Sequence, residues 1–202
     1  MNKKLLFVAC GAVIAVGVVT ATTAGANTRS AKAKLATADG TKVGTVDFRT
    51  AHGHTEVRVR LAAVPGVDAF HGFHIHANDV VNETNGQGCI ADSAAAPATW
   101  FASADGHYNP TGQSHSRHVG DLPLVYVNAD GSIETHFRID KINPCDLDGR
   151  AVIVHGGTDN FGNIPVGGAA TQYTANSPDA ITATSRTGNA GDRIACGVIT
   201  ER

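Results

Sequence analysis

Histidines and aspartates occur in three short groups whose spacing could bind metal ions. The first group is the stretch FHIH, in which His74 and His76 stand two residues apart. Residues two apart on a β-strand project from the same face, so these imidazoles can share one metal ion while Phe73 and Ile75 face the opposite, apolar side. An isolated pair of this kind is more often two surface histidines, so the other groups decide its interpretation.

The second and third groups lie further along the chain. Three histidines and one carboxylate fall within fifteen residues of GHYNPTGQSHSRHVGDL, which is enough for a tetrahedral zinc site. The residues are His107, His115, His118 and Asp121. In the third group His155 ends the apolar stretch AVIVH, and Asp159 follows four residues later. Each group alone could consist of hydrogen-bonded polar residues, but the three together predict a metal-binding protein.

His71 lies close to the first pair but does not belong with it. It stands three residues before His74, so the two side chains face opposite sides of a strand. We expect His71 to make a buried structural hydrogen bond.

The segments around these groups have the pattern of β-strands. In residues 55–64, charged residues alternate with Val57, Val59 and Leu61, as in a half-buried antiparallel strand. Further strands are predicted at 43–50, 123–127, 132–139, 151–155 and 195–200, and no convincing amphipathic helix of normal length is found. Residues 81–106 and 159–193 lack periodicity, so we expect two long functional loops in an all-β sandwich or barrel.

The composition is that of an ordinary globular protein. The 202 residues are 42% hydrophobic and 17% charged, with a net charge of −2 and ten histidines. No Lys/Arg cluster in the sequence would bind phosphate, which argues against a nucleic-acid partner.

The N-terminus resembles an export signal. A basic start, an apolar run and the small residues Ala24-Gly25-Ala26 predict a signal peptide over 1–26, then a flexible leader over 27–34 and one domain over 35–202. An uncleaved membrane anchor and a lipid-modified Cys10 are the alternatives; the mature chain would have no membrane span. The protein would be secreted, periplasmic or in the cell envelope. Cys89, Cys145 and Cys196 would remain, allowing one intramolecular disulfide.

Five motifs in order resemble the successive signatures of the copper/zinc superoxide dismutase family: GFHIH, GHYNP, RHVGDL, VIVHGGTDNFG and TGNAGDRIACGVI. The resemblance extends from Leu35 to the C-terminus. It implies a Greek-key β-sandwich or barrel of about eight antiparallel strands. It also implies dismutation of superoxide, a small anion, to molecular oxygen and hydrogen peroxide by a redox-cycling copper with an imidazolate-bridged zinc.

The resemblance also implies a role for each residue of the three groups. The implied copper ligands are His74, His76, His107 and His155. The implied zinc ligands are His107, His115, His118 and Asp121. His107 would bridge the two metals and act in catalysis, which requires a deprotonated imidazole that zinc can stabilise near neutral pH.

Four further residues match the family pattern. Asp159 would link the rings of His74 and His115, and Arg193 would be a catalytic arginine beside the copper. Cys89 and Cys196 would form the disulfide that ties the loop after the first copper pair to the last strand.

The sequence departs from the family pattern in the zinc loop, where only Ser116 and Arg117 separate two implied ligands. A copper-only dismutase is therefore one alternative. A non-catalytic copper/zinc carrier of the same fold is another. Residues 160–185 hold one charged residue, Asp179, so steering of superoxide would be weaker or come from elsewhere. The sequence leaves monomer and homodimer both open.

Overall fold

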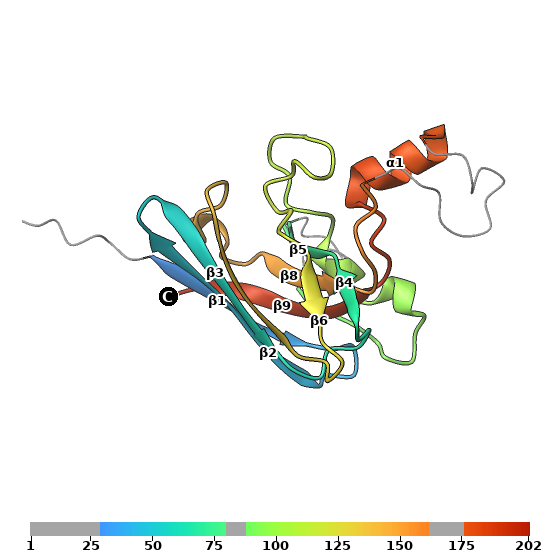
Figure 1. Ribbon diagram of the computed structural model, residues 1–202, viewed down its shortest axis with the longest axis horizontal. Helices are drawn as coiled ribbons and strands as arrows, with labels where there is room; N and C mark the ends of the chain where they lie inside the picture. The colour runs from blue at the N-terminus through green and yellow to red at the C-terminus, as the bar shows by residue number, and fades with distance from the viewer. Residues whose placement is uncertain (1–28, 80–87, 162–175) are drawn as a thin grey trace, which may run out of the picture.

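A computed structural model describes residues 29–79, 88–161 and 176–202, and this part of the chain is an all-β structure (Figure 1). Its strands are β1 (Ser30–Ala36), β2 (Lys42–Ala51), β3 (His54–Leu61), β4 (Ala69–His71), β5 (Phe73–His76), β6 (Val125–Val127), β7 (Ile133–Ile139), β8 (Ala151–His155) and β9 (Arg193–Glu201). Its helices are α1 (Pro178–Thr187) and the short 3-10 turns η1 (Pro97–Thr99), η2 (Ala102–Ala104) and η3 (Pro144–Asp146).

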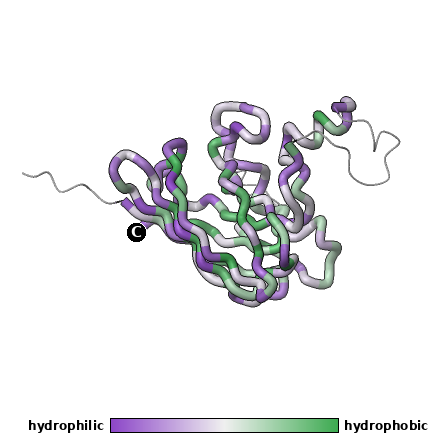
Figure 2. Tube along the Cα trace, in the orientation of Figure 1, coloured by the Kyte–Doolittle hydropathy of each residue, from purple (hydrophilic) through white to green (hydrophobic). Residues whose placement is uncertain are grey.

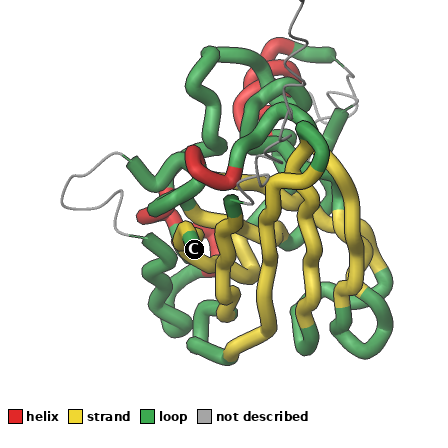
Figure 3. Tube along the Cα trace, turned by 90° about the vertical axis from the view of Figure 1, so that its left-hand side faces the viewer, coloured by secondary structure: helices red, strands yellow, loops and turns green. Residues whose placement is uncertain are grey.

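Seven strands form one curled antiparallel sheet in the order β5-β8-β9-β1-β2-β3-β7, and β4 pairs with β6 in a small second sheet. The expected all-β barrel-like fold is confirmed. Figure 3 shows the strands side by side, with loops and helix gathered beyond one end of them. In the sheet order, β5 and β8, which carry candidate metal ligands, stand at the opposite end from β3 and β7.

Alternation of side chains explains why these segments are strands. On β3, Val57 and Val59 are fully buried while Arg58 and Arg60 are exposed, and Phe48 of β2 is buried beside them. The alternating colours along β2 and β3 in Figure 2 follow this pattern. A shift of one residue would move every apolar side chain to the solvent face, so burial sets the register.

The flexible leader expected over 27–34 is wrong from Ser30 onward, where β1 begins. Ala31 and Ala33 point into the core, and the strand pairs with β2 on one edge and β9 on the other. Alanine is a weak apolar signal in a sequence, whereas backbone hydrogen bonds along both edges hold the strand in place. The expected signal peptide lies outside the described residues.

The expectation of no normal helix is also wrong, because α1 forms within the second long loop. Ser177 caps its N-terminus by accepting a hydrogen bond from the Ala180 amide, and Pro178 takes the first position. Gly188 ends the helix in the left-handed conformation, with φ 66°. Only Ala180 and Thr184 of this helix are buried, so its apolar face is too narrow for a clear helical periodicity. The caps were the signal that sequence reasoning missed.

The first long loop is tied to the sheet by a disulfide between Cys89 and Cys196, which confirms the expected pairing and leaves Cys145 free. The bond closes a loop of 107 residues between this loop and β9. None of the helices in the described residues is both long and apolar enough to cross a membrane.

Candidate metal centre

Strand β5 is the platform of the site. It pairs with β8, and the loop that contains His107 and Asp121 runs along its other edge. The Ile75 amide donates to the Gly120 carbonyl, and the Tyr108 amide donates to the Ile75 carbonyl, both at 2.8 Å. A Cβ atom on Gly120 would lie 2.2 Å from the Ile75 oxygen, so only glycine permits this approach. The loop thereby covers the His74 and His76 face of the strand, and both histidines are buried.

The first ligand group contains four buried imidazoles whose candidate ligand atoms lie within 4.8 Å of one another. Its members are His74, His76, His107 and His155. In three of them, the hydrogen bonds show which ring nitrogen is bonded to the protein and which is left for a metal ion. The Nδ1 of His76 donates to the Asp105 carbonyl at 2.8 Å, and the Nδ1 of His155 lies 3.2 Å from the Gly191 carbonyl. Their Nε2 atoms approach to 3.3 Å, while the Nδ1 of His74 is buried without a hydrogen-bond partner among the described residues.

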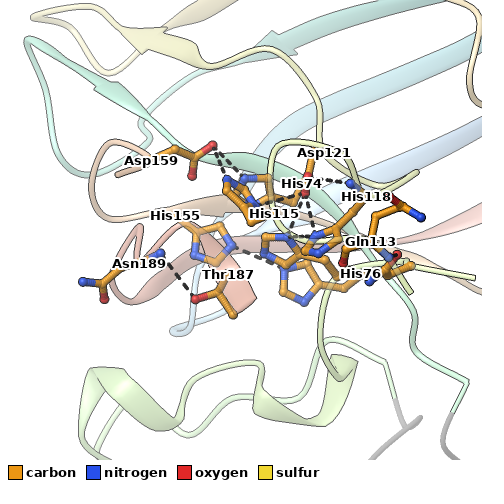
Figure 4. Close-up of polar contacts among 12 residues, drawn as sticks. His74, His76, Gln113, His115, His118, Asp121, His155, Asp159, Thr187 and Asn189 are labelled. Carbon is orange, nitrogen blue, oxygen red and sulfur yellow. Dashed lines mark hydrogen bonds and ion pairs between the residues drawn. The ribbon is translucent and has the colours of Figure 1, made fainter. Parts of the chain in front are cut away.

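The second group surrounds one oxygen of Asp121. The Nδ1 atoms of His107, His118 and His115 lie 2.9, 3.1 and 3.3 Å from its Oδ1. Figure 4 shows His115 and His118 close to Asp121. The other oxygen, Oδ2, accepts a hydrogen bond from the His118 amide at 2.9 Å. The four residues whose ligand atoms all lie within 4.8 Å of one another are His74, His107, His115 and Asp121, so this tighter set contains His74 and not His118. His118 lies slightly outside it, although its Nδ1 is 3.3 Å from the Nδ1 of His107. All four residues expected at a zinc site are thus close together, with the three histidines around the Asp121 carboxylate.

His107 belongs to both groups. Its Nδ1 faces Asp121 and His118, while its Nε2 is buried and has no hydrogen-bond partner in the described part of the chain. Its ring centre lies 4.0 Å from that of His74 and 4.9 Å from that of His76. One ring therefore presents a nitrogen to each group.

Asp159 connects the two groups from outside. Its Oδ2 accepts a hydrogen bond from the Nε2 of His74 at 3.0 Å and lies 3.4 Å from the Nε2 of His115 (Figure 4). Burial alone would raise the pKa of this carboxyl, but the contacts with His115 and His74 outweigh burial and hold the pKa well below its usual range. An ionised Asp159 fixes the orientation of both rings.

The site separates neutral imidazoles from a charged one. Burial, reinforced by neighbouring histidines and Arg193, places the pKa values of His76 and His155 well below the ordinary value, and burial lowers the pKa of His107 to about 4. These rings are neutral at neutral pH, as metal ligation requires. At His115, burial is outweighed by Asp121 and Asp159, whose carboxylates raise the pKa to about 9. Asp121 itself has a pKa held far below its usual range, against the effect of burial, by His107 and His115.

Arg193 lies at the start of β9 and is held by two backbone carbonyls. Its guanidinium donates to the Phe101 oxygen through Nη1 and to the Asp105 oxygen, at 2.6 Å, through Nη2. The same Asp105 carbonyl accepts the Nδ1 proton of His76, so one peptide oxygen links the arginine to a ligand ring. Phe101 and Asp105 flank η2 and have φ values of 55° and 64°, which turns both carbonyls toward β9.

His71 is confirmed as a structural residue. Its Nδ1 lies 2.7 Å from the His155 carbonyl and its Nε2 lies 2.5 Å from the Gly66 carbonyl, so neither nitrogen is left for a metal.

Sequence reasoning missed several residues that support the short turn between His115 and His118. Lys141 donates to the His118 carbonyl at 2.8 Å, and Ser116 adopts φ 76° to make the tight turn. A Cβ atom on Gly188 would lie 2.4 Å from the His115 ring, and Phe161 stacks on the same ring with centres 5.7 Å apart. Of these residues, only Gly188 could be recognised from the local sequence, as the residue that ends a helix. The contacts of Lys141 and Phe161 join segments that are distant in sequence.

Comparisons with known proteins agree with the family resemblance of the sequence motifs. The family model described as copper/zinc superoxide dismutase matches residues 42–199. The "Superoxide dismutase [Cu-Zn]" of Mycobacterium tuberculosis is 36% identical over 178 residues, which cover 85% of this chain and 70% of that protein. The protein of the same name from Paramecium bursaria Chlorella virus 1 is 30% identical over 191 residues, covering 90% of this chain and 84% of that protein.

A solved structure supports the fold. The crystal structure of a double mutant of a SOD-like protein from Bacillus subtilis superposes with a TM-score of 0.57 at 24% identity, covering 84% of this chain and 96% of that chain. The family model covers most of the chain, and the curated relatives align over most of their own length. This chain belongs to the copper/zinc superoxide dismutase family.

Proposed function

We propose that the protein is a superoxide dismutase that converts two superoxide ions and two protons into molecular oxygen and hydrogen peroxide. Copper would be held by the first ligand group and zinc by the second. The observation that carries the proposal is His107, whose two nitrogens face two separate ligand groups.

The donor sets fit these two metals. The first group offers imidazole nitrogens alone, which suit a copper ion that changes oxidation state, and two of its nitrogens, on His74 and His107, are buried without partners among the described residues. The second group offers three imidazole nitrogens and one carboxylate oxygen, a closed tetrahedral set for zinc.

Copper, when bound, supplies the one-electron exchange with superoxide, first accepting and then donating an electron. The protein supplies charge and protons. His107 can hold a proton at Nε2 while its Nδ1 stays in the second group, and can pass that proton to reduced dioxygen. Arg193 is a permanent cation with five N–H donors, of which the described bonds use two, so it can attract and orient a small anion.

An oxidising compartment is part of the proposal. The Cys89–Cys196 disulfide supports export, because such bonds are rare where thiols are kept reduced.

The test is elemental analysis and a superoxide assay on the same purified sample. We expect about one copper and one zinc per chain, and a rate that follows copper content as copper is removed and restored. Metal binding without activity would favour the carrier. Full activity with copper and no zinc at saturating supply would favour the copper-only enzyme.

A further inference from the structure

A second charged region lies on the outer face of the sheet formed by β1, β2, β3 and β7. Cross-strand pairing aligns its side chains in rows, such as Lys32, Asp47, Arg58 and His136. A groove on this face is lined only by charged residues and a histidine. The lining residues are Lys32, Asp47, Arg49, Glu56, Arg58, Arg60 and His136.

Both acidic residues of the groove have cationic partners of their own. Asp47 pairs with Lys32 at 3.0 Å, and Glu56 pairs with Arg138 at 2.9 Å. The described structure contains no carboxylate in ion-pair contact with the remaining three arginines, which are Arg49, Arg58 and Arg60. All three are exposed. Strand pairing places a carboxylate opposite each of them: Asp47 opposite Arg58, Glu56 opposite Arg49 and Glu134 opposite Arg60. The groove lining holds four permanent cations and two carboxylates, so it carries a net positive charge in a protein of net charge −2.

These arginines stand in three successive rows. Arg60 and Arg58 are two residues apart on β3, and Arg49 of β2 lies opposite Glu56, one row further on. Residues two apart on a strand are separated by about 6.5–7 Å, so each successive row offers one of these guanidinium groups along the groove. A guanidinium matches a phosphate group with two parallel hydrogen bonds.

We propose that this groove binds a linear polymer carrying phosphate groups at regular spacing. The regular rows favour a chain of anions over one small anion. The lining contains no Phe, Tyr or Trp side chain on which a base could stack, and His136 is its one ring, which favours a phosphate polymer over single-stranded nucleic acid. Strands β5 and β8 of the metal centre lie at the opposite end of the sheet order from β3 and β7, so a bound polymer would leave the centre open (Figure 1).

The test is binding of long-chain inorganic polyphosphate to the metal-loaded protein, measured by titration calorimetry at several salt concentrations. The substitutions Arg49→Gln, Arg58→Gln and Arg60→Gln together should weaken binding at least tenfold and flatten its dependence on salt. A control with the same change in net charge, Lys42→Gln, Arg186→Gln and Arg202→Gln, should stay within twofold of the unchanged protein. Asp47→Asn, which frees Lys32, should tighten binding at least twofold.

Three outcomes would overturn the proposal. They are equal loss of binding in the two triple variants, binding of orthophosphate as tight as that of the polymer, and tighter binding of a single-stranded oligonucleotide of matched charge. The superoxide rate at equal copper content should not change in the Arg49, Arg58 and Arg60 variant, so this test and that of the proposed enzyme activity fail independently.

Discussion

At the scale of single residues, the partner of one ring nitrogen decides what the other nitrogen can do. The Nδ1–H of His76 donates a hydrogen bond to the Asp105 carbonyl, which leaves Nε2 for the first ligand group. His71 has a backbone carbonyl at each nitrogen. Two histidines five residues apart therefore have different roles, although both are buried.

This difference predicts opposite effects of two alanine substitutions. His76→Ala should remove most of the bound copper and most of the activity while the protein stays folded. His71→Ala should keep copper but lower the free energy of unfolding by about 3 kcal/mol, through lost hydrogen bonds and a cavity. Copper analysis and denaturant unfolding on both variants check this, and copper loss confined to His71→Ala would show that the assignment is reversed.

Arg193 should contribute to the rate without holding metal. Arg193→Ala should slow the reaction by on the order of tenfold, equivalent to losing about 1.4 kcal/mol of attraction for the anion, and should weaken the dependence of rate on ionic strength. Arg193→Lys should restore part of the rate, because it keeps the charge but not the planar donors.

The measurement is the superoxide rate at low and high salt with copper content determined for each sample. Arg186→Ala, which removes an exposed charge on α1, is the control and should have a smaller effect. A rate equal to that of the unchanged protein in Arg193→Ala would make Arg193 a structural residue.

At the scale of elements, the end of α1 supports the second ligand group. The His115 amide donates to the Ser185 carbonyl at 2.7 Å, and Gly188 packs against the His115 ring. The helix therefore fixes both the backbone and the ring of one candidate zinc ligand. These two contacts hold His115 in place although only two residues separate it from His118.

Gly188→Ala should weaken zinc binding because the added methyl group would occupy the space of the His115 ring. Gly149→Ala is a matched control: both glycines have positive φ, 66° and 78°, but a Cβ on Gly149 meets nothing within 4 Å. Both variants should lose about 1 kcal/mol of stability from backbone strain, and only Gly188→Ala should also release zinc more readily. Competition with a chromogenic chelator measures this, and equal zinc affinity in the two variants would contradict it.

At the scale of the whole molecule, the candidate metal centre joins strands β5, β8 and β9, which are neighbours in the sheet, to loops that lie outside the sheet. Its candidate ligands come from β5, from the loop at 107–121 and from the end of β8, and Asp159 and Arg193 approach from the second long loop and β9. A metal bound by these segments stabilises only the folded chain, because the unfolded chain has no such arrangement.

Zinc should therefore raise the unfolding temperature in a concentration-dependent way. At a free zinc concentration about 1,000 times the dissociation constant, the stabilisation should be about 4 kcal/mol. His118→Ala should reduce this gain, whereas His136→Ala, on the outer sheet face, should not. Calorimetric scans of metal-free protein with added zinc measure the effect; an unfolding temperature that did not change with zinc would count against a zinc site here.

The sequence alone was enough to predict most of the strands, though not β1, and the identity of the grouped residues. Period-two alternation over residues 55–64 reflects a local rule, the alternate facing of side chains on a strand, and the same rule paired His74 with His76. The motif order pointed to the family, and the disulfide between Cys89 and Cys196 followed from the resemblance and is confirmed. The first and last residues of the strands differ from expectation by a few positions, because the hydrogen bonds to the neighbouring strand decide where a strand ends.

Only the tertiary structure decided what depends on contacts between distant segments. The support of Arg193 by the Asp105 carbonyl and of His118 by Lys141 joins residues 88 and 23 positions apart, so no local pattern could reveal it. The helix α1 has too narrow an apolar face to be seen by periodicity and is held by its caps and by His115. The sequence contains no Lys/Arg run, yet strand pairing places Arg49 on the same sheet face as Arg58 and Arg60, one row from the first and two rows from the second, because a sheet brings together residues that the chain keeps apart.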